Sequence, residues 1–215
     1  GPRGTGKTSI ARILAKAVNC VVRSQKLEVG NQGGEPCNEC AACKTITEGR
    51  ALDVLEIDAA SHTGVDNVRE TIVETAKFAP SLLRYKVFII DEAHMLSTSA
   101  WNALLKIMEE PPAHVIFVLA TTEAHKVPTT ILSRCQRFDF HRIRLPDLVE
   151  RLKFIASQEK VRVAAPVLQS VARLAEGCVR DAESVLEQLL ALGEKEITED
   201  RASLILPRTA VPAVL

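Results

Sequence analysis

Gly1-Pro-Arg-Gly-Thr-Gly-Lys-Thr8 opens the sequence, and the residues after it have the apolar spacing of a helix. A glycine, four residues, then glycine, lysine and threonine predicts a loop whose backbone N–H groups turn inward around phosphate groups. The helix predicted over residues 8–18 begins at this loop, and a helix N-terminus attracts anions through its partial positive charge. This stretch therefore predicts an α/β fold that binds a nucleotide.

The loop residues have distinct expected parts in holding ATP and Mg²⁺. Lys7 adds a positive charge at the β- and γ-phosphates, and the Thr8 hydroxyl suits Mg²⁺. A chance glycine-rich turn is the alternative. A loop of this kind normally follows a buried strand, so we expect a strand before Gly1. The residues expected at the nucleotide are Gly1, Pro2, Arg3, Gly4, Thr5, Gly6, Lys7, Thr8 and Ser9.

Apolar runs of strand length alternate with helical patterns through the first two thirds of the chain. Continuous apolar runs such as Lys86-Val-Phe-Ile-Ile-Asp91 suit parallel strands covered on both faces. The alternation predicts a doubly wound parallel α/β sheet. The predicted strands are residues 53–58, 86–91, 114–120 and 136–140, and the predicted helices are residues 8–18, 41–48, 65–78 and 98–110.

The pattern becomes helical after Pro146. Helical spacing recurs over residues 147–158, 165–176, 179–192 and 198–206. The sequence therefore predicts three parts: an α/β domain over residues 1–143, a small helical lid domain over residues 144–206, and a tail over residues 207–215 that no pattern assigns.

Polar residues follow two of the predicted buried strands. Asp91-Glu-Ala-His94 ends one strand, and the carboxyl ends of parallel strands gather at the ligand crevice. Asp91 is expected to hold Mg²⁺ through water, and Glu92 to orient and deprotonate the attacking water. Thr122 follows the next strand and is expected to hold that water or to sense the γ-phosphate. A solvated acidic turn and a threonine cap are the alternatives.

Cys37, Cys40 and Cys43 supply three thiols at close spacing, and Cys20 offers a fourth. Zn²⁺ in structural sites takes four tetrahedral ligands, often from Cys-x₂-Cys turns. We therefore expect a zinc module over residues 20–43 with no catalytic role. An iron–sulfur cluster and ordinary free thiols are the alternatives. Cys135 and Cys178 are expected to be unliganded.

Two arginines stand in positions that suit contact with a γ-phosphate. Arg134 lies in Leu132-Ser-Arg-Cys135 before a predicted strand, and Arg180 opens a helix of the second domain. An arginine at a domain or subunit edge can stabilise charge in phosphoryl transfer. For any single arginine, a surface ion pair is the alternative.

Composition limits the other possibilities. The chain has 215 residues, with 27 basic and 27 acidic side chains, and 4% of its residues are aromatic. A broad electrostatic grip on nucleic acid is therefore not indicated. No apolar run approaches the roughly 18 residues of a membrane helix, and no signal peptide opens the sequence. Clustered cysteines beside a nucleotide loop favour metal binding in a reducing cytoplasm, and we expect no membrane partner.

A series of motifs, taken together and in order, closely resembles the gamma/tau subunits of bacterial DNA polymerase III, the clamp-loader ATPases of the AAA+ class. The resemblance extends to about residue 206. The cysteine module together with Ser-Arg-Cys is its most specific part. The motifs are the opening phosphate loop, the cysteine module, Glu56-Ile-Asp-Ala-Ala-Ser61, Asp91-Glu-Ala-His-Met-Leu-Ser97, Asn102-Ala-Leu-Leu-Lys106, Glu109-Glu-Pro-Pro112, Leu119-Ala-Thr-Thr122 and Ile131-Leu-Ser-Arg-Cys135.

The resemblance implies a function in DNA replication. Gamma/tau copies form a pentameric ring with delta and delta-prime subunits. ATP binding lets the ring open the sliding β-clamp and grip primer–template DNA, and hydrolysis releases the closed clamp. The ring belongs to the DNA-directed DNA polymerase III holoenzyme, a transferase, but this chain has no polymerase active site. The implied location is the bacterial cytoplasm, at replication forks on the nucleoid.

The resemblance also assigns residues. Asp91 and Glu92 become the Walker B pair, and Thr122 becomes the first sensor. Arg134 resembles the arginine finger that acts on a neighbour's ATP, and Arg180 resembles the second sensor, which reaches its own subunit's nucleotide. We expect that the family's first strand and its C-terminal collar domain lie outside this sequence.

Two other functions are compatible with parts of the pattern. Another AAA+ DNA-processing motor would share the phosphate loop and the acidic pair, but would not be expected to carry the cysteine module. A nucleotide-bound structural subunit that does not hydrolyse would be expected to have a degraded loop or a replaced Glu92, and both are intact.

Overall fold

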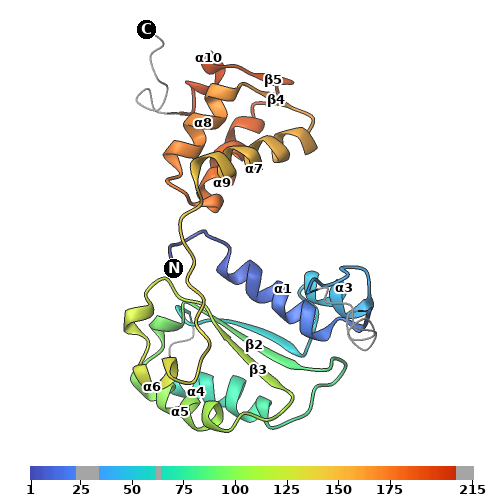
Figure 1. Cartoon of the computed structure of the whole chain (residues 1–215), viewed down its shortest axis with the longest axis vertical. Helices are drawn as coiled ribbons and strands as arrows, with labels where there is room; N and C mark the ends of the chain where they lie inside the picture. Colours follow the sequence, from blue (N-terminus) through green and yellow to red (C-terminus); the bar gives the residue numbers. More distant parts are fainter. Residues whose placement is uncertain (23–33, 62–63, 207–215) are drawn as a thin grey trace. The chain divides into compact units, whose positions relative to one another are not determined.

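The computed structural model of the chain describes residues 1–22, 34–61 and 64–206 (Figure 1). The chain forms two compact units, one of Lys7–Phe138 and one of Gly1–Gly6 with Asp139–Leu215, and each is described by itself. The boundary after Phe138 lies slightly before the one expected at residue 143, and the first six residues group with the second unit. The predicted tail over residues 207–215 lies outside the described residues.

A parallel sheet of three strands is the centre of the Lys7–Phe138 unit. Its strands are β1 (Val54–Asp58), β2 (Lys86–Asp91) and β3 (Val115–Leu119), in the order β1-β2-β3. Asp58 is in register with Asp91, so the carboxyl ends of β1 and β2 reach the same edge. These strands confirm three of the four strand predictions.

Helices cover both faces of this sheet (Figure 1). One face carries α1 and α3, and the other carries α4, η1, α5 and α6. A parallel sheet covered on both faces is the doubly wound arrangement that the sequence predicts. The helices are α1 (Lys7–Asn19), α3 (Ala41–Thr47), α4 (Val65–Val68), the π-helix η1 (Arg69–Glu74), the 3₁₀ turn η2 (Ala93–Met95), α5 (Thr98–Glu109), the 3₁₀ turn η3 (Ala124–Lys126) and α6 (Thr129–Leu132).

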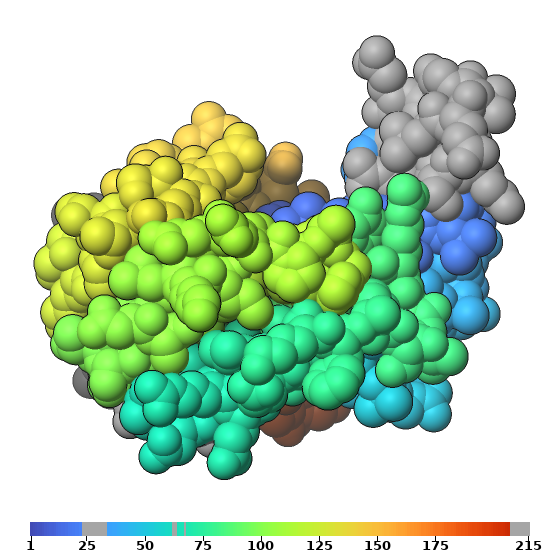
Figure 2. All heavy atoms as spheres, turned by 90° about the horizontal axis from the view of Figure 1, so that it is seen from below, coloured from blue at the N-terminus to red at the C-terminus, as the bar shows by residue number. Residues whose placement is uncertain are grey.

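The alternation of side chains along β2 explains why both faces are covered. Val87 and Ile89 pack in the cluster that includes Ala15 of α1, whereas Phe88 and Ile90 pack in the cluster on the other side. All four β2 side chains are fully buried. In Figure 2 the teal atoms of η1 and the green atoms of α5 lie side by side over that second face.

The second unit is a helical bundle with its own core. Leu148, Leu152, Leu186 and Leu189 are fully buried in that core. This agrees with the expected helical lid. Its elements are α7 (Leu145–Gln158), β4 (Arg162–Val163), α8 (Ala165–Leu174), α9 (Val179–Leu190), β5 (Glu196–Ile197) and α10 (Glu199–Ala202).

Several local predictions differ from the structure. Residues 136–140 form no strand. Alternating apolar and polar residues indicate an extended segment, but a strand also needs a neighbouring strand to pair with, and the alternation does not show one. The helix predicted over residues 65–78 contains the π-helix η1, and the last predicted helix is only the short α10. The parallel pair β4–β5 was not predicted, since two-residue strands leave no periodic signal. Within the described residues, no helix has the length and apolar character needed to span a bilayer.

Candidate functional site

The start of α1 meets the carboxyl end of β2. The Thr8 hydroxyl donates a hydrogen bond to Asp91 Oδ2 over 2.6 Å. Asp91 is the last residue of β2, and its other oxygen accepts the Glu92 N–H over 2.9 Å. The structure therefore brings together the two residues that the sequence predicted for Mg²⁺, and a hydroxyl beside a carboxylate suits that ion.

Glu92 is held by the end of the neighbouring strand. Its Oε2 accepts hydrogen bonds from the Thr122 hydroxyl over 3.0 Å and from the Thr122 N–H over 3.3 Å. Glu92 also has a left-handed backbone, with φ 45° and ψ 43°. Non-glycine residues adopt that conformation at a cost, and such strain clusters at functional sites. The structure thus pairs the predicted base with the predicted first sensor.

His94 lies beside this group, although the sequence pattern predicts no role for it. Its Nδ1 lies 3.0 Å from the Thr121 hydroxyl and 3.3 Å from Glu92 Oε2. The signal in the sequence was its place two residues after Glu92, but only the fold shows which groups meet its ring.

The phosphate loop has the backbone that its glycines predict. Gly4 and Gly6 have positive φ angles of 66° and 88°. A Cβ at Gly4 would lie 2.1 Å from Cys178 Sγ and 3.3 Å from Arg180 Cβ, so only glycine fits there. The Val179 N–H donates to the Gly4 carbonyl over 3.0 Å. Within the unit of residues 1–6 and 139–215, the predicted second sensor Arg180 therefore lies beside the phosphate loop.

Arg134 takes partners outside the Asp91–Glu92 group. Its Nη2 donates to Glu109 Oε1 over 2.6 Å, and its Nη1 donates to the Thr130 carbonyl over 2.5 Å. Both side chains of the ion pair are partly exposed to solvent. An exposed pair of this kind is weak, about 0–1 kcal/mol, so Arg134 can exchange Glu109 for another anion.

The four clustered cysteines converge. The Sγ atoms of Cys20, Cys37, Cys40 and Cys43 all lie within 4.8 Å of one another. A tetrahedral zinc site with Zn–S bonds of about 2.3 Å requires S···S distances of about 3.8 Å, so the cluster fits four-thiolate coordination after small adjustments. Residues 23–33, between Cys20 and Cys37, lie outside the described residues.

Local structure shifts the pKa values of two of these thiols in opposite directions. The Cys40 N–H donates to Cys37 Sγ over 3.3 Å, and this hydrogen bond together with one from the Glu39 backbone lowers the pKa of Cys37 to about 6. Burial raises the pKa of Cys43 to about 12. Cys43 is fully buried, and a metal would favour the thiolate there by neutralising its charge. Burial also raises the pKa values of Cys135 and Cys178, which lie outside the cluster.

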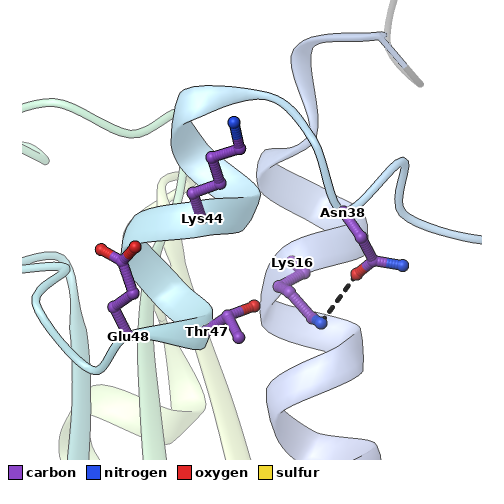
Figure 3. Close-up of a pocket in the computed structure, with 5 residues that line it drawn as sticks. All are labelled: Lys16, Asn38, Lys44, Thr47 and Glu48. Carbon is purple, nitrogen blue, oxygen red and sulfur yellow. Dashed lines mark hydrogen bonds between the residues drawn. The ribbon is translucent and has the colours of Figure 1, made fainter.

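A small hollow lies between α1 and α3 (Figure 3). Across it, Lys16 Nζ donates to Asn38 Oδ1 over 2.8 Å. None of its lining residues belongs to the predicted nucleotide site, so this hollow is not the candidate site. The lining residues are Lys16, Asn38, Lys44, Thr47 and Glu48.

Known families match the chain in two parts. Residues 1–144 match a family described as DNA polymerase III, delta subunit. Residues 147–195 match a family described as DNA polymerase III clamp loader subunit, ATPase lid domain.

Curated relatives match nearly the whole chain. DNA polymerase III subunit tau of Bacillus subtilis (strain 168) is 54% identical over 205 residues, which are 95% of this chain and 35% of the relative. Subunit tau of Escherichia coli (strain K12) is 44% identical over 206 residues, 96% of this chain and 31% of the relative. Protein STICHEL-like 1 of Arabidopsis thaliana is 44% identical over 201 residues, 93% of this chain and 17% of the relative. The chain thus spans about a third or less of the length of these relatives.

A solved structure shares the fold. The Thermotoga maritima RuvB Holliday junction branch migration motor has a TM-score of 0.66 and 16% sequence identity, and the match covers 95% of this chain and 58% of that chain. At this identity the likeness shows the fold alone, which is the AAA+ arrangement of a parallel sheet with a helical lid.

Proposed function

We propose that this chain, which belongs to the gamma/tau family of DNA polymerase III subunits, hydrolyses ATP to load the sliding β-clamp onto primed DNA. The observation that carries the proposal is the arrangement at the carboxyl edge of the sheet. Thr8 meets Asp91 there, and Thr122 holds Glu92. A hydroxyl and carboxylate for a metal, beside a second carboxylate held by a strand end, are what nucleotide hydrolysis requires.

The side chains divide the work of hydrolysis. Lys7 places its charge at the β- and γ-phosphates, and Thr8 and Asp91 hold Mg²⁺. When bound, Mg²⁺ supplies positive charge to the phosphate oxygens. Glu92 orients the attacking water and accepts its proton, while Thr122 fixes the carboxylate through the hydrogen bonds described above. The remaining loop residues other than Pro2 contribute backbone N–H groups, and Gly4 and Gly6 supply the positive φ angles of the loop.

Two arginines complete the proposal. Arg180, beside Gly4, acts as the second sensor of the chain's own nucleotide. Arg134 acts as an arginine finger on the ATP of a neighbouring subunit, and its exposed pairing with Glu109 supports a role outside its own site.

The thiolate cluster is proposed to hold one structural Zn²⁺. Support comes from the mutual proximity of Cys20, Cys37, Cys40 and Cys43. Four sulfur ligands leave no open position on the metal, so the site stabilises the module and takes no part in catalysis.

The proposed partners are further gamma/tau copies with delta and delta-prime subunits in a pentameric ring, the β sliding clamp and primer–template DNA. The protein would act in the bacterial cytoplasm within the DNA-directed DNA polymerase III holoenzyme. The relatives from Bacillus subtilis and Escherichia coli are named as subunits of DNA polymerase III, which supports this assignment.

Another AAA+ DNA-processing motor is the main alternative, and a nucleotide-bound subunit that does not hydrolyse is the next. The fold is shared with a branch migration motor, so the fold does not discriminate between them. The intact Glu92, held by Thr122, favours hydrolysis over a purely structural role.

The test is the ATPase activity of the full-length protein, assembled with its partner subunits, with and without clamp and primed DNA. The proposal expects clamp and primed DNA together to raise turnover well above the effect of either alone. If neither the clamp nor primed DNA changed the rate of ATP hydrolysis, the clamp-loading proposal would be wrong and another AAA+ motor would be favoured.

A further inference from the structure

His94 spans the space between two carboxylates at the carboxyl edge of the sheet. Its side chain is only 9% exposed. While its Nδ1 contacts Thr121 and Glu92, its Nε2 lies 3.6 Å from Glu123 Oε2. The ring therefore links the proposed base, Glu92, to a second carboxylate that the proposed function does not use.

Glu123 is fixed where it can hold that ring. Its N–H donates to the Thr121 hydroxyl over 3.0 Å, which places Thr121 between the two residues. Its ion pair with Lys126 keeps the pKa of Glu123 below its usual value. The Oε2 atom that contacts Lys126 Nζ in this ion pair is buried. Buried carboxylate oxygens need polar partners, and the His94 ring is close by.

Glu92 needs support from neighbouring side chains because its backbone conformation is strained. Its left-handed conformation is strained, so contacts must hold the residue in place. Thr122 and His94 both approach the same oxygen, Oε2, at 3.0–3.3 Å. Oε1 is therefore the oxygen left for a ligand.

We propose that His94 is a positioning residue for Glu92, anchored by Thr121 and by the Glu123–Lys126 ion pair. The proposal rests on the proposed function, in which Glu92 is the base. Polar groups near both nitrogens of a histidine ring hold the plane of that ring. Such a ring fixes the carboxylate that receives the proton of water. It therefore contributes to turnover and leaves nucleotide affinity unchanged.

The experiment compares His94→Phe, His94→Asn and Glu123→Gln in the full-length protein within the assembled ring. An asparagine can keep a polar group near Nδ1 but cannot reach Glu123, whereas phenylalanine loses both contacts. We expect His94→Phe to lower kcat for ATP hydrolysis by about 10- to 100-fold, because small errors in positioning have effects of this size. Smaller losses are expected for His94→Asn and Glu123→Gln. The dissociation constant for ATP should stay within about twofold of the wild-type value, as measured by equilibrium titration.

His125→Asn is the matched control. His125 is the same residue type in the adjoining turn η3, but it is exposed, so kcat should not change. Thermal unfolding of each variant checks that the fold persists, and Glu123→Gln provides an independent test if His94→Phe does not fold.

A double-mutant comparison separates positioning from a general structural effect. In a Glu92→Gln background, His94→Phe should cause no further loss of turnover, because its effect passes through Glu92. An additive loss, weaker ATP binding or an unchanged kcat in the single variants would overturn the role of His94. If Glu92→Gln itself keeps full turnover, the proposed function fails instead, so the two failures are distinguishable.

Discussion

The two edges of the three-stranded sheet both carry charged and polar side chains, but they use them in opposite ways. At the amino edge these groups bond to the backbone. Asp53 accepts three N–H groups of residues 81–83 over 2.7–2.9 Å. Lys86 Nζ donates to two carbonyls over 3.0 Å, and His114 Nε2 lies 3.1–3.2 Å from two carbonyls. These residues hold the connecting segments in place.

At the carboxyl edge the side chains bond largely to one another. Thr8 bonds to Asp91, Thr122 bonds to Glu92, and His94 lies between Glu92 and Glu123. Contacts between side chains can rearrange when a ligand arrives, whereas loss of the contacts to the backbone would release the connecting segments that they hold. What a polar side chain bonds to therefore distinguishes the residues that hold the connecting segments from those proposed to act on a nucleotide.

Zinc removal should give the largest effect and extend the comparison to the thiolate cluster. Its four thiolates would all bind one metal, so the cluster should stabilise the fold as the contacts at the amino edge do. We expect about one zinc per chain by metal analysis, and loss of that zinc with Cys43→Ser. Removal should unfold the module, because structural zinc contributes on the order of 10 kcal/mol to folding. Circular dichroism and limited proteolysis measure this. Cys135→Ser is the control, and a metal-free preparation that stays folded would refute the site.

Glu92→Gln tests the carboxyl edge. The amide keeps the size of the side chain but cannot accept the proton of water. We expect kcat for ATP hydrolysis to fall about 10²- to 10⁴-fold, the usual contribution of a general base. ATP binding and the unfolding midpoint should stay near wild type. Glu110→Gln, at an exposed position, should leave kcat unchanged. Undiminished hydrolysis would show that Glu92 is not the base.

Asp53→Asn tests the amino edge and should give the smallest effect. Burial alone would raise the pKa of Asp53, but the three N–H donors together with Lys86 hold it below its usual value. A lowered pKa in the folded state means that the carboxylate stabilises the protein above its unfolded pKa of about 3.9, and that this stability is lost as pH falls through the folded value. We expect Asp53→Asn to lower the free energy of unfolding at neutral pH by about 2 kcal/mol.

Denaturant unfolding from neutral pH into the acid range measures the Asp53 effect. The wild-type protein should lose its advantage over Asp53→Asn as pH falls below about 4. Asp66→Asn, at an exposed position, should shift stability by no more than about 0.5 kcal/mol. A constant difference across pH would show that the charge of Asp53 contributes nothing. If Asp53→Asn lost much of its kcat/KM while its stability stayed intact, the two edges would not differ in the way described.

The sequence predicted the parts of this protein that depend on short spacing. The phosphate loop, the helix after it, and strands β1, β2 and β3 follow from local patterns, because a helix or buried strand leaves its period in neighbouring residues. The sequence also predicted correctly that Asp91 and Glu92 lie at the end of a strand, because they directly follow its apolar run. The strand predicted over residues 136–140 was wrong, because alternation says nothing about a partner.

The order of residues sets which chemical groups are available and where the chain becomes helical or extended. Which of these groups meet depends on how the elements pack. Thr8 and Asp91 are 83 positions apart, and Glu92 and Thr122 are 30 apart. Such contacts arise when parallel strands bring their ends to one edge, and no local period records them. The same packing places Asp53 against backbone N–H groups and His94 against Glu92. The polar residues at the two edges of the sheet therefore have different kinds of partner.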